Sequence, residues 1–106
     1  MSIKVKVIYL QQLPAELGAN SGEDVFALDA VASVVDLMNA IIAKYAPRSR
    51  DVLPRLDGSA ENCSGIAIAL QREGVPGSRR IKHTVAADVK LTDSDTILLY
   101  HPMAGG

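Results

Sequence analysis

One segment of this chain carries the repeat of an amphipathic helix, and the other apolar runs carry the repeat of strands. In residues 33–45 the apolar positions recur at intervals of three and four, which gathers them on one stripe: Val34, Leu37, Met38, Ile41, Ile42 and Tyr45. Ser33 is a suitable N-cap, Asp36 gives a capping-box pattern, and Pro47 ends the helix. A helix with such a stripe normally lies across a sheet, so the sequence predicts one main helix on a sheet.

The strands of that sheet are predicted at 3–10, 25–29, 65–71 and 96–100, with a weaker one at 81–86. In the first strand Ile3, Val5, Val7 and Tyr9 share one face. Residues 96–100 are apolar on both faces, which suits a central strand or one whose outer face is kept for a partner. The order of elements predicts an α+β fold with a mixed sheet of four to five strands.

Size and composition exclude several classes of protein. A chain of 106 residues with 48% apolar residues forms one domain with a modest core. The net charge of −1 argues against nucleic acid as a partner, and the sequence has neither a signal peptide nor an apolar run long enough to cross a membrane. The single Cys63 excludes an intramolecular disulfide and fits a reducing cytoplasm.

The sequence ends in two glycines, Gly105 and Gly106. Without Cβ atoms they make a thin tip that can enter a narrow channel, at a cost in ordering entropy. Side-chain bulk beside the terminal carboxylate would hinder an enzyme that acts on it. The alternative is an ordinary frayed chain end, which is commonly rich in small residues.

Residues 91–106 read LTDSDTILLYHPMAGG and resemble the C-terminal end of the MoaD/ThiS sulfur carriers, most closely the small subunit of molybdopterin synthase, MoaD. That family typically shows an L-x-D-G-D turn, an apolar strand, and then Pro-Pro-Val-x-Gly-Gly. The opening strand at 3–5 and the helix start at 33–37 also match in position and type. The resemblance implies a ubiquitin-like β-grasp domain at 1–101 followed by a flexible tail at 102–106.

The chain departs from the family pattern in three ways. Ser94 replaces the usual turn glycine, a change that many turn geometries tolerate. His101 replaces the first of the two prolines, which predicts a less rigid root for the tail. The connections at 11–24, 46–64 and 73–80 are longer than in a typical member.

The resemblance also implies a chemistry in which this chain is a reactant and not an enzyme. An E1-like adenylyltransferase of the MoeB/ThiF type would use ATP to convert the Gly106 carboxylate to an acyl-adenylate. A cysteine desulfurase or another sulfurtransferase would then supply a persulfide, which yields a Gly106 thiocarboxylate. In the molybdopterin branch that sulfur passes to a pterin precursor held by the large synthase subunit, of the MoaE type. The chain itself would bind no cofactor, and ATP would be bound by its partner.

The tail suits insertion into a partner, and the last strand suits docking. Five residues follow His101, and they span roughly 17 Å when extended. Pro102 restricts the backbone, Met103 and Ala104 can line an apolar channel, and Gly105 keeps the tip thin. If Ile97 and Leu99 face the core, the outward residues form a predicted partner-binding surface: Ile8, Leu98 and Tyr100. The alternative is that the 46–64 connection covers this surface as a second small core.

Other candidate sites are weaker. Cys63 has no histidine near it in sequence, so an incidental thiol is favoured over a nucleophile. His83 and His101 lack metal-ligand spacing, and one cysteine excludes a four-cysteine iron–sulfur site. A small basic cluster near residues 73–80 is interpreted as a solvated loop and not a phosphate site: Arg72, Arg79, Arg80 and Lys82.

Three functions therefore stay open. The first is a cytoplasmic sulfur carrier that acts through Gly106, with molybdopterin synthesis favoured. The second is a ubiquitin-like modifier joined to lysines through the same glycine. The third is a β-grasp interaction module whose terminal glycines are passive. An enzyme with its own active site ranks last, because no acid, base or nucleophile constellation is found.

Overall fold

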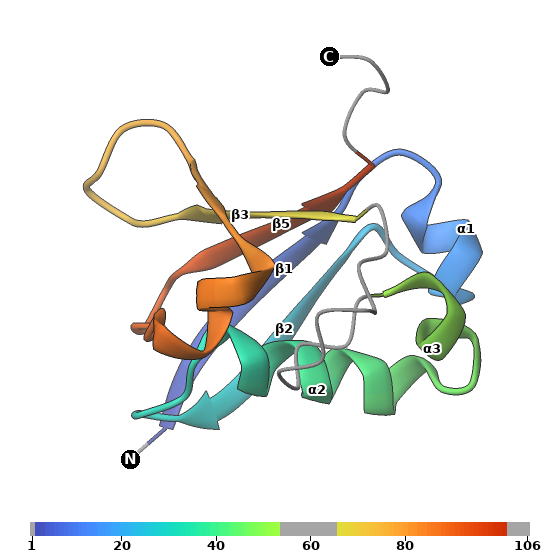
Figure 1. Ribbon diagram of the computed structural model, residues 1–106, viewed down its shortest axis with the longest axis horizontal. Coiled ribbons are helices and arrows are strands. Elements are labelled where there is room, and N and C mark those ends of the chain that lie inside the picture. The colour runs from blue at the N-terminus through green and yellow to red at the C-terminus, as the bar shows by residue number, and fades with distance from the viewer. Residues whose placement is uncertain (1, 54–65, 102–106) are drawn as a thin grey trace.

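The computed structural model describes residues 2–53 and 66–101 (Figure 1). Its elements in chain order are β1 (Ser2–Tyr9), α1 (Leu13–Leu17), β2 (Glu23–Asp29), α2 (Val34–Tyr45), α3 (Arg48–Val52), β3 (Ala67–Gln71), β4 (Arg79–Ile81), the 3₁₀ helix η1 (His83–Asp88) and β5 (Thr96–Tyr100). No helix within the described ranges has the length and apolar character needed to cross a membrane.

The strands form one five-stranded mixed sheet in the order β2-β1-β5-β3-β4. The first and last strands, β1 and β5, are parallel neighbours at its centre, with Val7 opposite Ile97. The other pairings, β1–β2, β3–β5 and β3–β4, are antiparallel. The predicted α+β class and mixed sheet are confirmed, and the centre of the sheet joins the two ends of the described chain.

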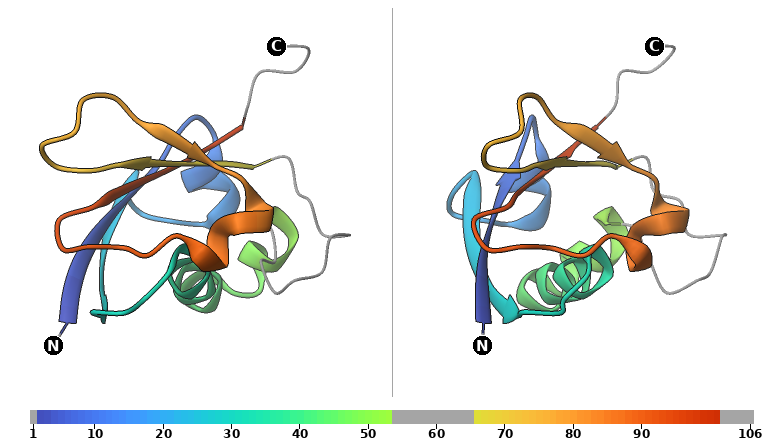
Figure 2. Two further views of the ribbon diagram at one scale, coloured as in Figure 1. Left: turned by 60° about the vertical axis from the view of Figure 1, so that its left-hand side comes forward. Right: turned by 90° about the vertical axis from the view of Figure 1, so that its left-hand side faces the viewer.

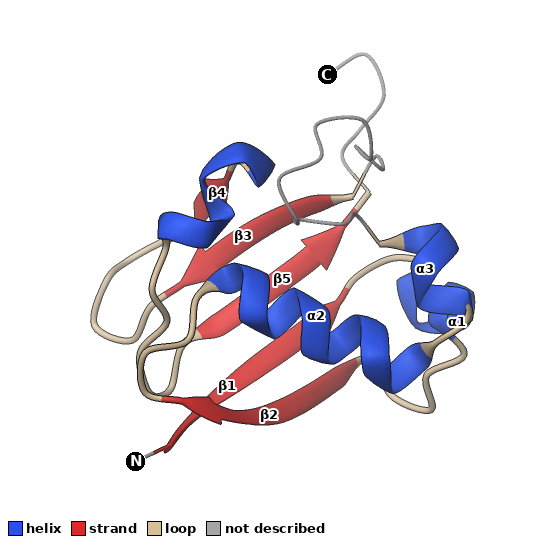
Figure 3. Ribbon diagram, turned by 60° about the horizontal axis from the view of Figure 1, so that its bottom comes forward, coloured by secondary structure: helices blue, strands red, loops and turns tan. Residues whose placement is uncertain are grey.

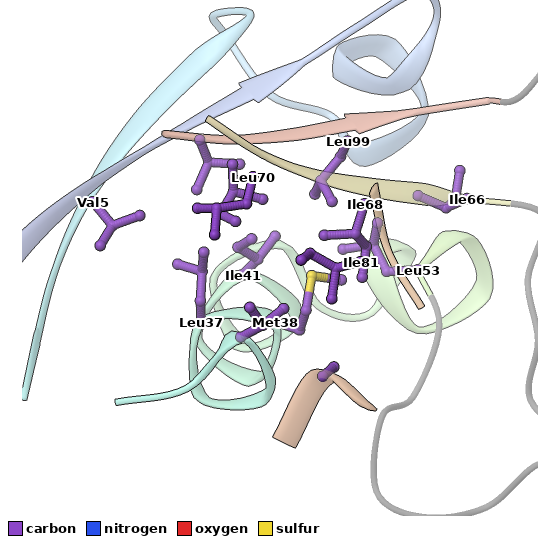
Figure 4. Close-up of a cluster of buried hydrophobic side chains, with 14 of the residues drawn as sticks. Val5, Leu37, Met38, Ile41, Leu53, Ile66, Ile68, Leu70, Ile81 and Leu99 are labelled. Atoms are coloured by element: carbon purple, nitrogen blue, oxygen red, sulfur yellow. The ribbon is translucent and has the colours of Figure 1, made fainter. Parts of the chain in front are cut away.

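Helix α2 lies across one face of this sheet (Figure 3). Its first turn has the predicted capping box, in which the Ser33 backbone N–H donates to Asp36 Oδ2 at 2.9 Å. The predicted stripe is buried at its centre, at Val34, Leu37, Met38 and Ile41, and partly buried at Ile42 and Tyr45. The inward side chains of the sheet meet this stripe to form the core (Figure 4).

Two connections that the sequence left as loops each hold a short helix. Residues 11–24 include α1, which buries Leu13 and Leu17, and α3 occupies 48–52 in the connection after α2. The buried Ser49 hydroxyl of α3 donates to the Ile42 carbonyl at 2.6 Å. Helices of five residues are too short to display a repeat, so their sequences carry no periodic signal.

The weak strand predicted at 81–86 is wrong in position. The strand is β4, at Arg79–Ile81, and the chain then forms η1 at His83–Asp88. Ile81 and Ala86 are both buried, but Val85 between them is 42% exposed, so the segment has no continuous inward face. The 3₁₀ turn brings His83 Nε2 to 2.8 Å from the carbonyl of Ile66.

Candidate functional site

The last strand, β5, presents one face to the core and the other away from the helices. Ile97 and Leu99 are fully buried, whereas Leu98 and Tyr100 alternate with them on the opposite face and are half-buried. The helices lie together on the core side of the sheet (Figure 2), where α1 contacts α3, and α2 contacts α3 and η1.

The outward face has a half-buried apolar centre, which we call the open face: Ile8, Leu98 and Tyr100. Ile8 of β1 is opposite Leu98, and Leu98 is opposite Ala69 of β3, so the residues lie in adjacent rows. The structure thus brings together the three residues predicted as a partner-binding surface. Ala67 and Ala69 of β3 lie beside them but are buried, at 2% and 3% exposed. The role of the open face in binding stays a prediction.

Cationic side chains flank the open face. Lys4 and Lys6 follow the same alternation along β1 and are exposed. Arg80, opposite Ala69 on the edge strand β4, is also exposed. An apolar centre between positive charges favours a partner surface that is apolar with an acidic rim.

The described part of the 46–64 connection does not cover this face. Helix α3 contacts α1 and α2, which places it on the helix side of the sheet. Residues 54–65 lie outside the described ranges, and Cys63 is among them.

The end of β5 is held by the connection that follows β1. The Leu10 backbone N–H donates to the Leu99 carbonyl at 2.9 Å. The His101 N–H donates to Gln11 Oε1 at 2.6 Å, and Gln11 Nε2 donates to the His101 carbonyl at 3.0 Å. His101 Nε2 also lies 2.6 Å from Glu16 Oε1. The sequence predicted a less rigid root at His101, but the structure holds this residue by its backbone and its side chain.

A buried carboxylate organises the turn that leads into β5. Asp95 Oδ1 accepts from Arg72 Nε at 3.1 Å and from Thr92 Oγ1 at 3.0 Å, and Oδ2 accepts from Arg72 Nη2 at 3.0 Å and from the Thr92 N–H at 2.8 Å. Burial alone would raise the pKa of Asp95, but the bonds from Arg72 and Thr92 outweigh it and hold the pKa below its ordinary value. Arg72 was predicted to belong to a solvated basic cluster, and the structure instead assigns it to this ion pair.

Ser94 in the same turn adopts the left-handed conformation, with φ of +70°. Its N–H donates to the Lys4 carbonyl at 2.9 Å, while Asp93 Oδ1 accepts from the Lys4 N–H at 2.8 Å. The turn therefore pairs with β1, and its central residue has the backbone geometry that glycine adopts most easily.

A second charged group, which sequence reasoning missed, joins β2 to α2. Asp24 accepts from Tyr9 at 2.9 Å, from Tyr45, and from Lys44 Nζ at 2.7 Å. Burial would raise the pKa of Asp24, but hydrogen bonds from Lys44 and the two tyrosines lower it overall. Burial and the bond to Asp24 also raise the pKa of Tyr9, so its hydroxyl stays protonated as a donor.

The remaining candidate residues lie apart from one another or outside the description. His83 and His101 bind different elements, and no cluster of three metal-ligating side chains occurs in residues 2–53 and 66–101. The predicted tail residues lie beyond the described ranges: Pro102, Met103, Ala104, Gly105 and Gly106.

Solved structures with the same arrangement are found by comparison of the folds. A candidate molybdopterin converting factor subunit 1 of Pyrococcus furiosus superposes with a TM-score of 0.67 at 22% identity, covering 95% of this chain and 99% of that one. Small archaeal modifier protein 1 of Methanosarcina acetivorans gives a TM-score of 0.66 at 24% identity, covering 100% and 99%. The fold is the ubiquitin-like β-grasp.

A third β-grasp structure, small archaeal modifier protein 1 of Haloferax volcanii, gives a TM-score of 0.63 at 14% identity, covering 95% of this chain and 99% of that one. No protein-family model matches the chain, and no curated protein matches it in sequence. The resemblance to MoaD/ThiS carriers is thus confirmed at the level of the fold, among neighbours that are MoaD-like proteins and small ubiquitin-like modifiers.

Proposed function

We propose that this protein is a sulfur carrier, a co-substrate and not an enzyme, whose Gly106 is converted to a thiocarboxylate. The observation that carries the proposal is the position of β5 at the centre of a β-grasp sheet, beside the apolar open face and in the same C-terminal segment as the diglycine sequence. A carrier needs a docking surface near its reactive glycine, because a partner must hold the domain while it acts on that glycine.

The chemistry begins at the Gly106 carboxylate, which is a poor electrophile. An E1-like partner lets this carboxylate attack the α-phosphate of ATP, so that pyrophosphate leaves and an acyl-adenylate forms. The terminal sulfur of a donor persulfide then displaces AMP, and a second thiol reduces the remaining S–S bond to release the thiocarboxylate. We place these steps in the cytoplasm, where ATP is present and thiols stay reduced.

Docking is assigned to the open face. Ile8, Leu98 and Tyr100 are half-buried in the free protein, so a partner that covers them gains apolar burial at the strand that precedes the tail. Lys6 and Arg80 lie beside this centre and suit an acidic rim on the partner. The E1-like enzyme and the acceptor-binding partner would use this face in turn.

Molybdopterin synthesis is the pathway we favour for the sulfur. The His101-Pro102 sequence before Met103 lies closer to the pattern of the molybdopterin branch than to that of the thiazole branch. The molybdopterin converting factor among the fold neighbours supports the same choice. The final partner would then be a large synthase subunit of the MoaE type that holds the pterin precursor.

Protein conjugation is the second candidate, because two of the fold neighbours are small archaeal modifiers that match over nearly their whole length. The same Gly106 adenylate would then be attacked by a lysine amine of a target protein, with loss of AMP and formation of an isopeptide bond.

Pyrophosphate exchange with a purified E1-like enzyme of the same host tests the shared first step. The full chain should support ATP–pyrophosphate exchange, and a variant without Gly105 and Gly106 should not. Adding a persulfide donor should then give the thiocarboxylate, whereas a ladder of conjugates on a denaturing gel would favour the modifier. If neither the full chain nor the shortened one supports exchange, the terminal glycines are passive and the interaction module is correct.

A further inference from the structure

The hydrogen bonds at His101 continue the central sheet by means of a side chain. The ladder between β1 and β5 ends with the bond from Leu10 N–H to the Leu99 carbonyl. At Gln11 the backbone turns away in the left-handed conformation, with φ of +59°. The Gln11 amide then bonds both the N–H and the carbonyl of His101, at 2.6 and 3.0 Å. A primary amide carries one donor group and one acceptor group, so it pairs with a residue as a neighbouring strand would.

Helix α1 supplies a second contact to the same residue. Glu16 Oε1 lies 2.6 Å from His101 Nε2, so an imidazole that carries its proton on Nε2 donates to the carboxylate. Leu13 and Leu17 anchor α1 in the core, which fixes the position of Glu16 between them. We call Gln11, Glu16 and His101 the root clamp.

We propose that the root clamp fixes the backbone and side chain of His101, the residue before the tail, and that Gln11 and Glu16 are positioning residues for the activation of Gly106. This inference rests on the proposed function. A residue that is already held at the root of the tail has less conformational entropy to lose when a partner binds the chain. The clamp acts at the last residue before that tail.

The residue type at position 101 gives a reason for the clamp. The family pattern places proline at this position, where the ring fixes φ but removes the N–H. His101 lacks that restriction and keeps an N–H, and Gln11 binds this group. A proline nitrogen has no hydrogen to donate to Gln11, so a residue at this position has either the ring or the hydrogen bond. In this chain the hydrogen bond to Gln11 takes the place of the ring.

The test uses the variant Gln11→Asn in the full chain. Asparagine adopts the left-handed conformation readily, so the backbone at residue 11 is retained, but its side chain is one methylene shorter and does not reach His101. Gln12→Ala is the matched control, because Gln12 is an exposed neighbour whose side chain makes no cap hydrogen bond. Amide hydrogen exchange of His101 and kcat/KM for Gly106 adenylation by the E1-like enzyme are measured for each.

We expect faster exchange at His101 and a three- to tenfold lower kcat/KM in Gln11→Asn, with Gln12→Ala unchanged; tenfold corresponds to about 1.4 kcal/mol. Adding His101→Pro to Gln11→Asn should restore kcat/KM, because the ring replaces the clamp. A merely structural role for Gln11 predicts no such rescue.

Two results overturn the inference, and they are distinguishable. If the wild-type chain is adenylated and Gln11→Asn has the same kcat/KM as Gln12→Ala, the clamp has no positioning role. If the wild-type chain is not adenylated at all, the proposed function fails, and the positioning role fails with it.

Discussion

Replacement of Asp95 by asparagine should destabilise the fold more than the loss of one surface ion pair does. All four groups that face the carboxylate act as donors: Arg72 Nε, Arg72 Nη2, the Thr92 N–H and the Thr92 hydroxyl. An amide offers one acceptor oxygen, so its NH₂ must replace the other. With the oxygen toward the Thr92 N–H, the NH₂ faces the Thr92 hydroxyl, which can turn to accept, and Arg72 Nε, which cannot.

The size of the decrease in the free energy of unfolding follows from the hydrogen bonds that an asparagine at position 95 does not make. A hydrogen bond to a charged group contributes about 1.5–3 kcal/mol. In Asp95→Asn the bond from Arg72 Nε becomes a contact between two donors, and the bond from Arg72 Nη2 meets a neutral acceptor in place of a carboxylate. The Asp95 side chain is 1% exposed, but that of Arg72 is 39% exposed, so water recovers part of the arginine's loss. We therefore expect a loss of about 2 kcal/mol in the free energy of unfolding, or about 10 °C in Tm for a domain of this size.

Chemical denaturation of Asp95→Asn and of the control Asp93→Asn measures this difference. Asp93 is exposed, and its Oδ1 accepts a hydrogen bond from the Lys4 N–H, which an asparagine oxygen can also accept. The control should change stability by less than about 0.5 kcal/mol. A loss in Asp95→Asn no larger than that of the control would refute the assignment of Asp95 as the organiser of the turn.

The pH dependence gives an independent check. The pKa of Asp95 is lowered in the folded state, so its ionised form stabilises the fold above the ordinary aspartate value of about 4. That contribution is lost as the pH falls below about 4 through the lowered pKa. The difference in the free energy of unfolding between wild type and Asp95→Asn should thus be largest at neutral pH and should decrease in acid. Asp24 titrates in both proteins, so its contribution cancels from this difference.

Three further substitutions test the turn before β5, the open face and the Asp24 group. Ser94→Gly should raise the free energy of unfolding by about 0.5–1 kcal/mol, because glycine relieves the left-handed strain; a loss of stability would contradict the φ of +70°. Leu98→Asp should weaken binding to the E1-like enzyme by at least tenfold while Tm changes little, as titration calorimetry and thermal melting can show; unfolding would instead place Leu98 in the core. Tyr45→Phe should cost about 1 kcal/mol by denaturation, because it removes one donor to Asp24, and an unchanged stability would mean that this bond contributes nothing.

The central elements were predictable because their signals are local and periodic. The stripe from Val34 to Tyr45, with its capping box at Ser33 and Asp36, predicted α2 with its N-terminus in place. The alternation in β1 predicted which of its side chains face the core, and the two apolar faces of β5 suited a central strand. The sheet order places β5 at the centre, beside β1.

The contacts that complete the candidate site were not predictable, because each joins residues that are distant in sequence. Gln11 and His101 are 90 positions apart, and a glutamine in a turn-rich connection gives no sign of its partner. Asp24 likewise finds Tyr45 from 21 positions away. At 81–86 the apolar spacing was too short to distinguish a strand from a 3₁₀ turn, and tertiary packing decided it.

Intact mass spectrometry of the protein purified from its native host is the most direct test for a thiocarboxylate at Gly106. We expect a fraction that is heavier by the exchange of one oxygen for sulfur, with the change localised to the carboxyl group of Gly106. Complete absence of that species, both in the host and after incubation with ATP, the E1-like enzyme and a persulfide donor, would contradict the carrier function.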